Sequence, residues 1–431
     1  MNRNDKLIND EILSESIQSD VLKRNNKLIV LSKLLSNLKN NTIISVDGRW
    51  GTGKTYFVKQ FKYLVDNIEN YKDNKILNEN DKLYFNELHD SNLIVYYNAW
   101  ENDMHSNALE SLIYNILNEY PKFKNQVADF KDFKELFKSF ARDILYAASL
   151  NAFDLNSFDK LNSFEDLAKG IITIEEKKNA FNKLVDMVLG DKNRLILIID
   201  ELDRCKPSFA VEILETIKHF YNNDKITIIV STNNYELSNT IKNYYGSNFD
   251  GYGYLNKIYD YTIYLDSRDI KTYLQKQLNF CRQTWVYHDF SYLVMDYFDF
   301  TFRECNKFIT LYTALKNYIE IEKTFEEQNY IHTCIFVPIA LALKIKNIKK
   351  YDDFINKKGE SIIKEFLSKK IDGTKYEGWI KELIKIKESD NYKDKIIELY
   401  NDIFSEEYNY YRYPFMDVIS MLGMDININN N

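Results

Sequence analysis

A glycine-containing loop between two regular segments constrains the fold of this chain more than any other feature. The sequence TIISVDGRWGTGKTYF, from Thr42 to Phe57, begins with a β-branched run and ends in an apolar helical periodicity. It predicts a strand over 42–46, a loop from Asp47 and a helix that begins at Lys54. The chain has only 12 glycines among its 431 residues, so their concentration in this loop indicates a backbone requirement.

Four further segments have the character of strands, and helical periodicity separates them. They lie at 92–100, 194–200, 225–234 and, more weakly, 259–266. The nearly continuous aliphatic run at 194–200 is typical of the middle of a parallel sheet. Strands that alternate with helices predict an α/β fold with a parallel, doubly wound, five-stranded sheet.

The rest of the chain is helical in pattern. The stretch over about 101–190 predicts a large helical insertion between the second and third strands. From about residue 267 only helical periodicity occurs. We therefore expect an α/β domain over 1–266 and a mostly helical C-terminal region over 267–431.

Composition excludes several classes of protein. The 45% hydrophobic and 15% aromatic content can build a sizeable core, and the net charge of −7 gives no electrostatic case for wholesale nucleic-acid binding. The four cysteines and five histidines show no ligand spacing, which argues against a zinc site or a disulfide framework. No secretory signal is visible, and the longest apolar run, Cys334–Leu343, is about half of the ~20 residues that a membrane-spanning helix needs. These features predict a soluble, cytoplasmic protein.

The glycine loop fits a phosphate-binding pattern. Gly48, Gly53, Lys54 and Thr55 satisfy G-x-x-x-x-G-K-[ST]. The glycines let backbone amides surround phosphate oxygens, and the following helix points its positive end at them. Lys54 is then predicted to reach the β and γ phosphates, and the Thr55 hydroxyl to ligate Mg²⁺. The predicted nucleotide-binding residues also include Trp50, Gly51, Thr52 and Tyr56. We expect Trp50 to support the loop from outside, against the turn at 98–100.

An acidic pair follows the third strand, in LILIIDELDRC. Asp200 is predicted to deliver a carboxylate to the metal from the sheet's C-terminal edge, usually through water, as in a Walker B strand. Glu201 is predicted to be the general base that orients and polarises an attacking water. Such a pair is also found at solvated strand ends, and its coexistence with the glycine loop favours the catalytic interpretation.

Two further groups of polar residues leave alternatives open. Asp203 and Arg204 fit a pair behind the acidic residues, or an arginine that acts on a neighbouring subunit, or a local ion pair before the helix opened by Pro207. The fourth strand ends in Ser231, Thr232, Asn233 and Asn234. We expect Asn233 to sense the γ-phosphate or hold the water, and a simple turn is the alternative.

Taken together, these segments resemble the KAP family of P-loop NTPases, which belongs to the ATPases with an additional strand and a catalytic glutamate. The family's loop reads G-x-W-G-x-G-K-[ST], matched by residues 48–55. Its second strand ends in N-A-W, matched at 98–100, and its I-D-[DE]-L-D-R-C-x-P segment is matched from Ile199 to Pro207. The segments at 254–265 and 300–309 are also similar to the family.

The resemblance implies an ATP-binding, Mg²⁺-dependent, ATP-hydrolysing switch, in a bacterial regulatory or phage-defence setting. It also implies that Arg303 approaches the nucleotide and that the first part of the C-terminal region, to about 315, forms a lid. Two departures from the family are visible: the segment at 140–153 is too short and polar for the transmembrane helices that many members insert, and Asn233 stands where an aspartate is common.

Other functions stay open at this stage. One is a scaffold that binds nucleotide with little turnover and signals by assembly, as a homo-oligomer or with an effector protein. Another is the ATPase subunit of a complex that acts on nucleic acid, for which the aromatic and basic stretch at 408–415 offers a stacking surface. A packed helix end is the alternative for that stretch.

Overall fold

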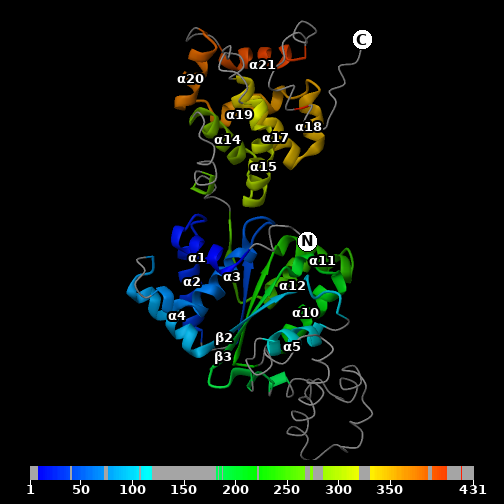
Figure 1. The fold of residues 1–431 in the computed structure, drawn as a ribbon. Helices are drawn as coiled ribbons and strands as arrows, with labels where there is room; N and C mark the ends of the chain where they lie inside the picture. Colours follow the sequence, from blue (N-terminus) through cyan, green and yellow to red (C-terminus); the bar gives the residue numbers. More distant parts are fainter. Residues whose placement is uncertain are drawn as a thin grey trace, which may run out of the picture. The chain divides into compact units, whose positions relative to one another are not determined.

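The computed structural model describes residues 8–38, 41–71, 76–105, 108–118, 181–182, 184–186, 188–220, 223–266, 272–274, 285–319, 331–386, 391–404 and 419. The chain divides into two compact units, drawn in Figure 1. The first comprises Met1–Arg49 and Gly53–Asp266, and the second comprises Ser267–Asn431 together with Trp50–Thr52 of the glycine loop. Most of the predicted insertion, over 119–180, and the aromatic stretch at 408–415 lie outside the described residues.

A five-stranded parallel sheet forms the centre of the first unit. Its strands are β1 (Thr42–Asp47), β2 (Asn92–Asn98), β3 (Arg194–Asp200), β4 (Ile226–Thr232) and β5 (Tyr261–Tyr264). They lie in the order β2-β3-β4-β1-β5, with every pair parallel. The predicted α/β fold with a parallel five-stranded sheet is thus confirmed, and β4 is the additional strand between β1 and β3.

The register brings the ends of the strands to one edge of the sheet. Asp47 pairs with Thr232, and Asp200 pairs with Ser231 on one side and with Asn98 on the other. Since the strands are parallel, the polar residues that end each of them meet at the carboxyl edge. The residues that the sequence predicted to bind nucleotide and metal follow the strands at this edge.

Helices cover both faces of the sheet, as Figure 1 shows. On one face lie α1 (Asp10–Ser19), α2 (Asn25–Asn37), α3 (Lys54–Asp66) and α4 (Glu79–Ser91); on the other lie α5 (Ala108–Asn118), α10 (Pro207–Phe220), α11 (Asn234–Tyr245) and α12 (Gly251–Ile258). Alternate residues of each strand enter opposite clusters, because side chains alternate across a strand. Along β3, Ile196 and Ile198 belong to the α3 side, whereas Leu195, Leu197 and Ile199 belong to the α10 side.

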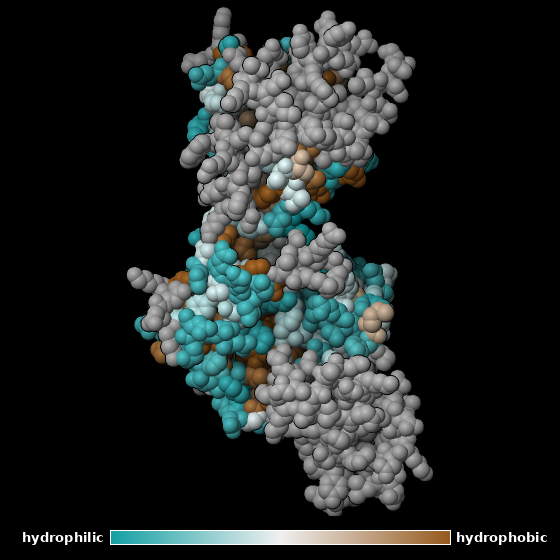
Figure 2. Space-filling view, in the orientation of Figure 1, coloured by the Kyte–Doolittle hydropathy of each residue, from teal (hydrophilic) through white to brown (hydrophobic). Residues whose placement is uncertain are grey.

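The apolar side chains of the first unit lie mainly in these two internal clusters. Its visible surface is accordingly mostly hydrophilic in Figure 2. Burial on both faces explains why the central strands read as continuous aliphatic runs in the sequence.

The described part of the second unit is helical. Its helices are α14 (Trp285–Tyr297), α15 (Phe302–Ile319), α17 (Val337–Lys346), α18 (Ile348–Ile355), α19 (Glu360–Lys370), α20 (Lys375–Leu383) and α21 (Tyr392–Asp402), with a π-helical turn, η5 (His332–Phe336), before α17. All of Val337–Leu343 is buried, so the longest apolar run of the chain is the core of this unit. No helix within the described ranges is both long and apolar enough to cross a membrane.

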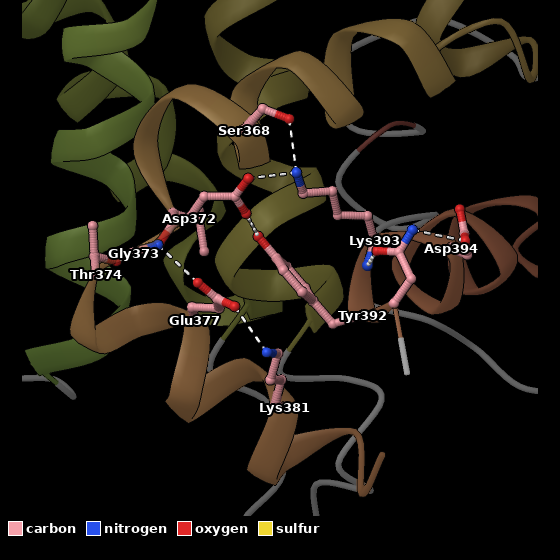
Figure 3. A network of polar contacts seen from close by, with 11 residues as sticks. Ser368, Asp372, Gly373, Thr374, Glu377, Lys381, Tyr392, Lys393 and Asp394 are labelled. Carbon is pink, nitrogen blue, oxygen red and sulfur yellow. Dashed lines mark hydrogen bonds and ion pairs between the residues drawn. The ribbon is translucent and has the colours of Figure 1, made fainter. Parts of the chain in front are cut away.

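A polar network joins α19, α20 and α21 (Figure 3). Asp372 accepts hydrogen bonds from the Tyr392 hydroxyl and from the ammonium of Lys393, which also donates to Ser368 Oγ at 2.9 Å. Beside it, Glu377 accepts from the Gly373 amide at 2.7 Å and pairs with Lys381 at 2.8 Å. Partial burial raises the pKa of Asp372, but the bonds from Lys393 and Tyr392 and the nearby lysine charges outweigh this, and its pKa is lowered. The charged groups of this network thus stabilise one another.

Candidate functional site at the carboxyl edge of the sheet

The glycine loop follows β1 directly and leads into α3. Gly51 and Gly53 both have φ of +87°, in the left-handed region that other residues rarely adopt, and Gly53 precedes the first residue of α3. The Gly48 amide donates to the Thr232 carbonyl at 3.4 Å, which ties the start of the loop to the end of β4. The glycines at 51 and 53 are therefore required by the backbone, as the sequence predicted for this loop.

Lys54 is folded back onto its own loop. Its ammonium donates to the Gly48 carbonyl at 2.6 Å and to the Arg49 carbonyl at 3.4 Å, and the residue is only 9% exposed. Burial lowers the pKa of Lys54, while the charges of Asp203, Asp200, Asp47 and Glu201 oppose this effect. Within the described ranges, the hydrogen bonds of this buried ammonium go to neutral carbonyls of its own loop, which a phosphate can replace.

Asp200 is buried at the end of β3, with one oxygen bonded and one not. The Tyr96 hydroxyl donates to Asp200 Oδ2 at 3.0 Å, whereas Oδ1 is buried and has no hydrogen-bond partner among the described residues. Burial raises the pKa of Asp200, and the hydroxyls around it and the ammonium of Lys54 oppose this effect. An orphaned carboxylate oxygen is the kind of ligand that Mg²⁺ or its bound water prefers. Asp200 and the Thr55 hydroxyl therefore fit the predicted metal site.

Glu201 is held by two neighbours immediately after the strand. The Thr55 hydroxyl donates to Oε1 at 3.2 Å, and Arg204 forms an ion pair with Oε2 at 2.6 Å. Glu201 itself has φ of +62°, an uncommon conformation for a residue with a side chain. It links β3 to the short 3₁₀ helix η4 (Leu202–Arg204), which turns Arg204 back toward the carboxylate.

Arg204 is fixed on its other side by an aromatic ring. Its guanidinium lies 5.5 Å from the centroid of the Trp100 ring, in a cation–π contact. Trp100 follows the end of β2, so the N-A-W segment and the segment after β3 meet here. The structure pairs Arg204 with Glu201, a partner that the sequence did not indicate, and the action of Arg204 on a neighbouring subunit stays a prediction.

The end of β4 contains two asparagines with different surroundings. Asn233 caps α11, and its Oδ1 accepts from the Glu236 amide at 3.5 Å. Asn234 is tied to three groups: its Nδ2 donates to Ser45 Oγ at 2.9 Å, its amide donates to Asp47 Oδ1 at 3.0 Å, and its Oδ1 accepts from Thr232 at 2.7 Å. The sensor role of Asn233 stays a prediction, while Asn234, which the sequence did not single out, joins β4 to β1.

The remaining predicted site residues are placed as follows. The Tyr56 hydroxyl donates to the Ile12 carbonyl at 3.2 Å and so connects α3 with α1. Trp50 is 45% exposed and Thr52 is buried. Arg303 is the second residue of α15, whose start is capped by Thr301 and Glu304, the Thr301 amide donating to Glu304 Oε2 at 2.7 Å. The nucleotide contacts of Trp50, Tyr56 and Arg303, and the packing of Trp50 against the turn at 98–100, stay predictions.

Sequence reasoning missed three contacts of this site. They are the hydroxyl of Tyr96 on Asp200, the pairing of Arg204 with Glu201, and the network of Asn234. The order of residues gives no signal for the first of these, because Tyr96 is one of 33 tyrosines. The position of Asn234 after a strand could have drawn attention to it, as it did for Asn233.

The parallel sheet with an additional strand, the glycine loop before α3 and the acidic pair at the end of β3 define a P-loop NTPase domain. Residues 24–288 match the KAP family P-loop domain. The match spans more than half of the chain, and the chain belongs to the KAP family. A search of the curated proteins found none that matches.

Proposed function

We propose that this protein binds ATP with Mg²⁺ and hydrolyses it, as a molecular switch. One cluster of side chains is the main support for this proposal. The Thr55 hydroxyl lies 3.2 Å from Glu201 Oε1, and the neighbouring Asp200 has a buried oxygen without a hydrogen-bond partner among the described residues. A hydroxyl at the start of the helix after the loop, a buried acid and a second acid beside it are the groups that metal-dependent NTP hydrolysis needs.

Each residue has a defined part in this mechanism. The loop amides and Lys54 bind and orient the phosphates, and Lys54 balances the charge that develops on the transferred phosphoryl group. Thr55 and Asp200 would hold Mg²⁺, which would neutralise negative charge on the phosphates. Glu201 orients the attacking water and accepts its proton. Catalysis is thus mainly positioning and electrostatic stabilisation.

The ion pair with Arg204 also bears on how fast the protein turns over. It occupies Oε2 of Glu201 at 2.6 Å, so the proposed base is held by a cation rather than directed at water. This favours slow basal hydrolysis that a partner or assembly accelerates. A bacterial signalling or phage-defence setting, with a homo-oligomer or an effector protein as partner, is the biological context that we propose for such a switch.

Replacement of Glu201 by glutamine tests the proposal. Glu201→Gln keeps the size of the side chain and removes the proton acceptor, so phosphate release should fall by about 10²- to 10⁴-fold. ATP affinity, measured by calorimetry, should be retained because the loop is unchanged. The matched control is Glu215→Gln on an exposed part of α10, which should keep full turnover. Undiminished phosphate release by purified Glu201→Gln protein would refute the assignment of the base.

The phosphate-release assay also distinguishes the proposed ATPase from a nucleotide-binding scaffold. A wild-type protein that binds ATP but releases no phosphate, with or without single- and double-stranded DNA, would be a nucleotide-binding scaffold. Salt-sensitive DNA binding in a mobility-shift titration would instead favour a nucleic-acid complex.

A further inference from the structure

We propose that Tyr96 is a positioning residue for the metal. Its hydroxyl fixes one oxygen of Asp200, so that the other is directed at the ion. This inference rests on the proposed function and assigns a part in it to a residue outside the glycine loop and the acidic pair.

The sheet register explains how Tyr96 reaches Asp200. Tyr96 lies on β2 directly opposite Ile198, and Asp200 is two residues further along β3. Residues related in this way lie on the same face of the sheet, at a distance that long side chains can span. The bond from the Tyr96 hydroxyl to Oδ2, at 3.0 Å, runs along this diagonal. Tyr96 belongs to the face that is covered by α3.

The helix that carries Thr55 also contacts Tyr96. The ammonium of Lys59 lies 5.0 Å from the centroid of the Tyr96 ring. Lys59 is four residues after Thr55 on α3, so both project from the same side of the helix. A cation against the ring face holds the ring by a cation–π contact. The contacts of Tyr96 thus connect α3, β2 and β3, the elements that provide both proposed metal ligands.

The bond has a directional consequence for Asp200. The terminal torsion of an aspartate is broad, so a buried carboxylate with no bonded oxygen could rotate. Once Oδ2 accepts from Tyr96, the orientation of Oδ1 is fixed as well. Oδ1 is the oxygen that is buried without a hydrogen-bond partner in the described structure. Hydrogen bonds that orient metal-ligating carboxylates in this way typically change metal affinity by 10- to 100-fold.

A pair of neighbouring tyrosines gives a matched test. Tyr96→Phe removes only the hydroxyl, and we expect about tenfold weaker Mn²⁺ binding to the ADP-loaded protein, measured by electron paramagnetic resonance titration. ADP affinity in EDTA should not change. The control is Tyr97→Phe: Tyr97 is the next residue of β2, lies on the opposite face, and shares a 2.8 Å hydrogen bond with Ser111. It should bind Mn²⁺ like the wild type.

The outcomes separate this inference from the proposed function. Equal Mn²⁺ affinity of Tyr96→Phe and wild type would overturn the inference and leave the proposed function standing. A loss of ADP affinity in EDTA together with a lower melting temperature would also overturn it, because Tyr96 would then be only structural. A wild-type protein that binds neither ADP nor Mn²⁺ would refute both. Selective weakening of Mn²⁺ binding in Tyr96→Phe alone supports the inference.

Discussion

Two aspartates in the molecule have opposite surroundings. Asp372, between α19 and α20, is partly exposed, is bonded to Tyr392 and Lys393, and has a lowered pKa. Asp200, at the end of β3, is buried, accepts from Tyr96 through Oδ2, has no hydrogen-bond partner for Oδ1 among the described residues, and has a pKa that burial raises. The first carboxylate stabilises the fold in its charged form, whereas the second is destabilised by its environment.

The contrast identifies the carboxyl edge of the sheet as a region where burial destabilises charged side chains. Burial opposes the charged form of Asp200 more than the ammonium of Lys54 and the surrounding hydroxyls favour it. Lys54 shows the same balance with the opposite sign, because burial lowers its pKa despite the charges of the nearby acidic residues. Burial thus outweighs the neighbouring charges for these two groups at the carboxyl edge of the sheet, whereas the more exposed charges of the α19–α21 network pair with one another and hold helices together.

The largest effect should come from removing the loop cation. Lys54→Ala should weaken ATP binding by at least about 100-fold, because charge-assisted bonds to phosphate contribute about 1.5–3 kcal/mol each. Lys393→Ala, which removes a cation from the α19–α21 network, should leave ATP affinity unchanged. Calorimetric titration measures both. Equal loss of affinity in the two variants would contradict the contrast between the two regions.

A smaller effect is expected when the partner of Glu201 is removed. Arg204→Met leaves a mostly buried carboxylate without its cation, since the side chains of Arg204 and Glu201 are 19% and 10% exposed. The free energy of unfolding should fall by about 1–3 kcal/mol. Lys393→Met breaks a more exposed pair and should cost less than about 1 kcal/mol. Urea denaturation measures the free energy of unfolding of both variants. An Arg204→Met protein as stable as the wild type would show that the ion pair contributes nothing to the stability of the fold.

The smallest effects should have opposite signs for the two aspartates. At pH 7 both carboxylates are charged in the unfolded chain. Because the pKa of Asp200 is raised in the folded state, its ionisation costs stability as the pH rises from about 4, the unfolded value, through the raised pKa. The lowered pKa of Asp372 means that its charge adds stability, which is fully present above about pH 4. Asp200→Asn should therefore raise the free energy of unfolding by about 0.5–2 kcal/mol. Asp372→Asn should lower it by less than about 1 kcal/mol.

Thermal melting at pH 7 measures both changes. A destabilised Asp200→Asn protein would mean that the fold already compensates the buried charge.

Much of the first unit could be predicted from its sequence, because its signals are local. Continuous aliphatic runs mark strands that are buried on both faces, and β3 and β4 begin and end within one or two residues of their predicted bounds. The glycines at 51 and 53 follow from backbone geometry. The predicted strands, loop and acidic pair were sufficient to predict a P-loop domain.

The contacts that complete the site were not predictable in the same way. The bond of Tyr96 to Asp200 depends on the register between β2 and β3, which sequence spacing does not determine. The ion pair of Arg204 depends on the positive φ of Glu201 and the short η4 turn. Both contacts arise from tertiary geometry, so no pattern of residue types in the sequence predicts them.

The strand between β1 and β3 has a consequence for the space in which a reaction can take place. Neighbouring strands lie about 4.8 Å apart, so β4 holds the strand before the glycine loop and the strand before Glu201 about 10 Å apart. Side chains span that separation, because the Thr55 hydroxyl at the start of α3 lies 3.2 Å from Glu201 Oε1. If the two strands were adjacent, their backbones would lie only about 5 Å apart. The order of strands thus sets the backbone separation that the side chains of the two segments bridge.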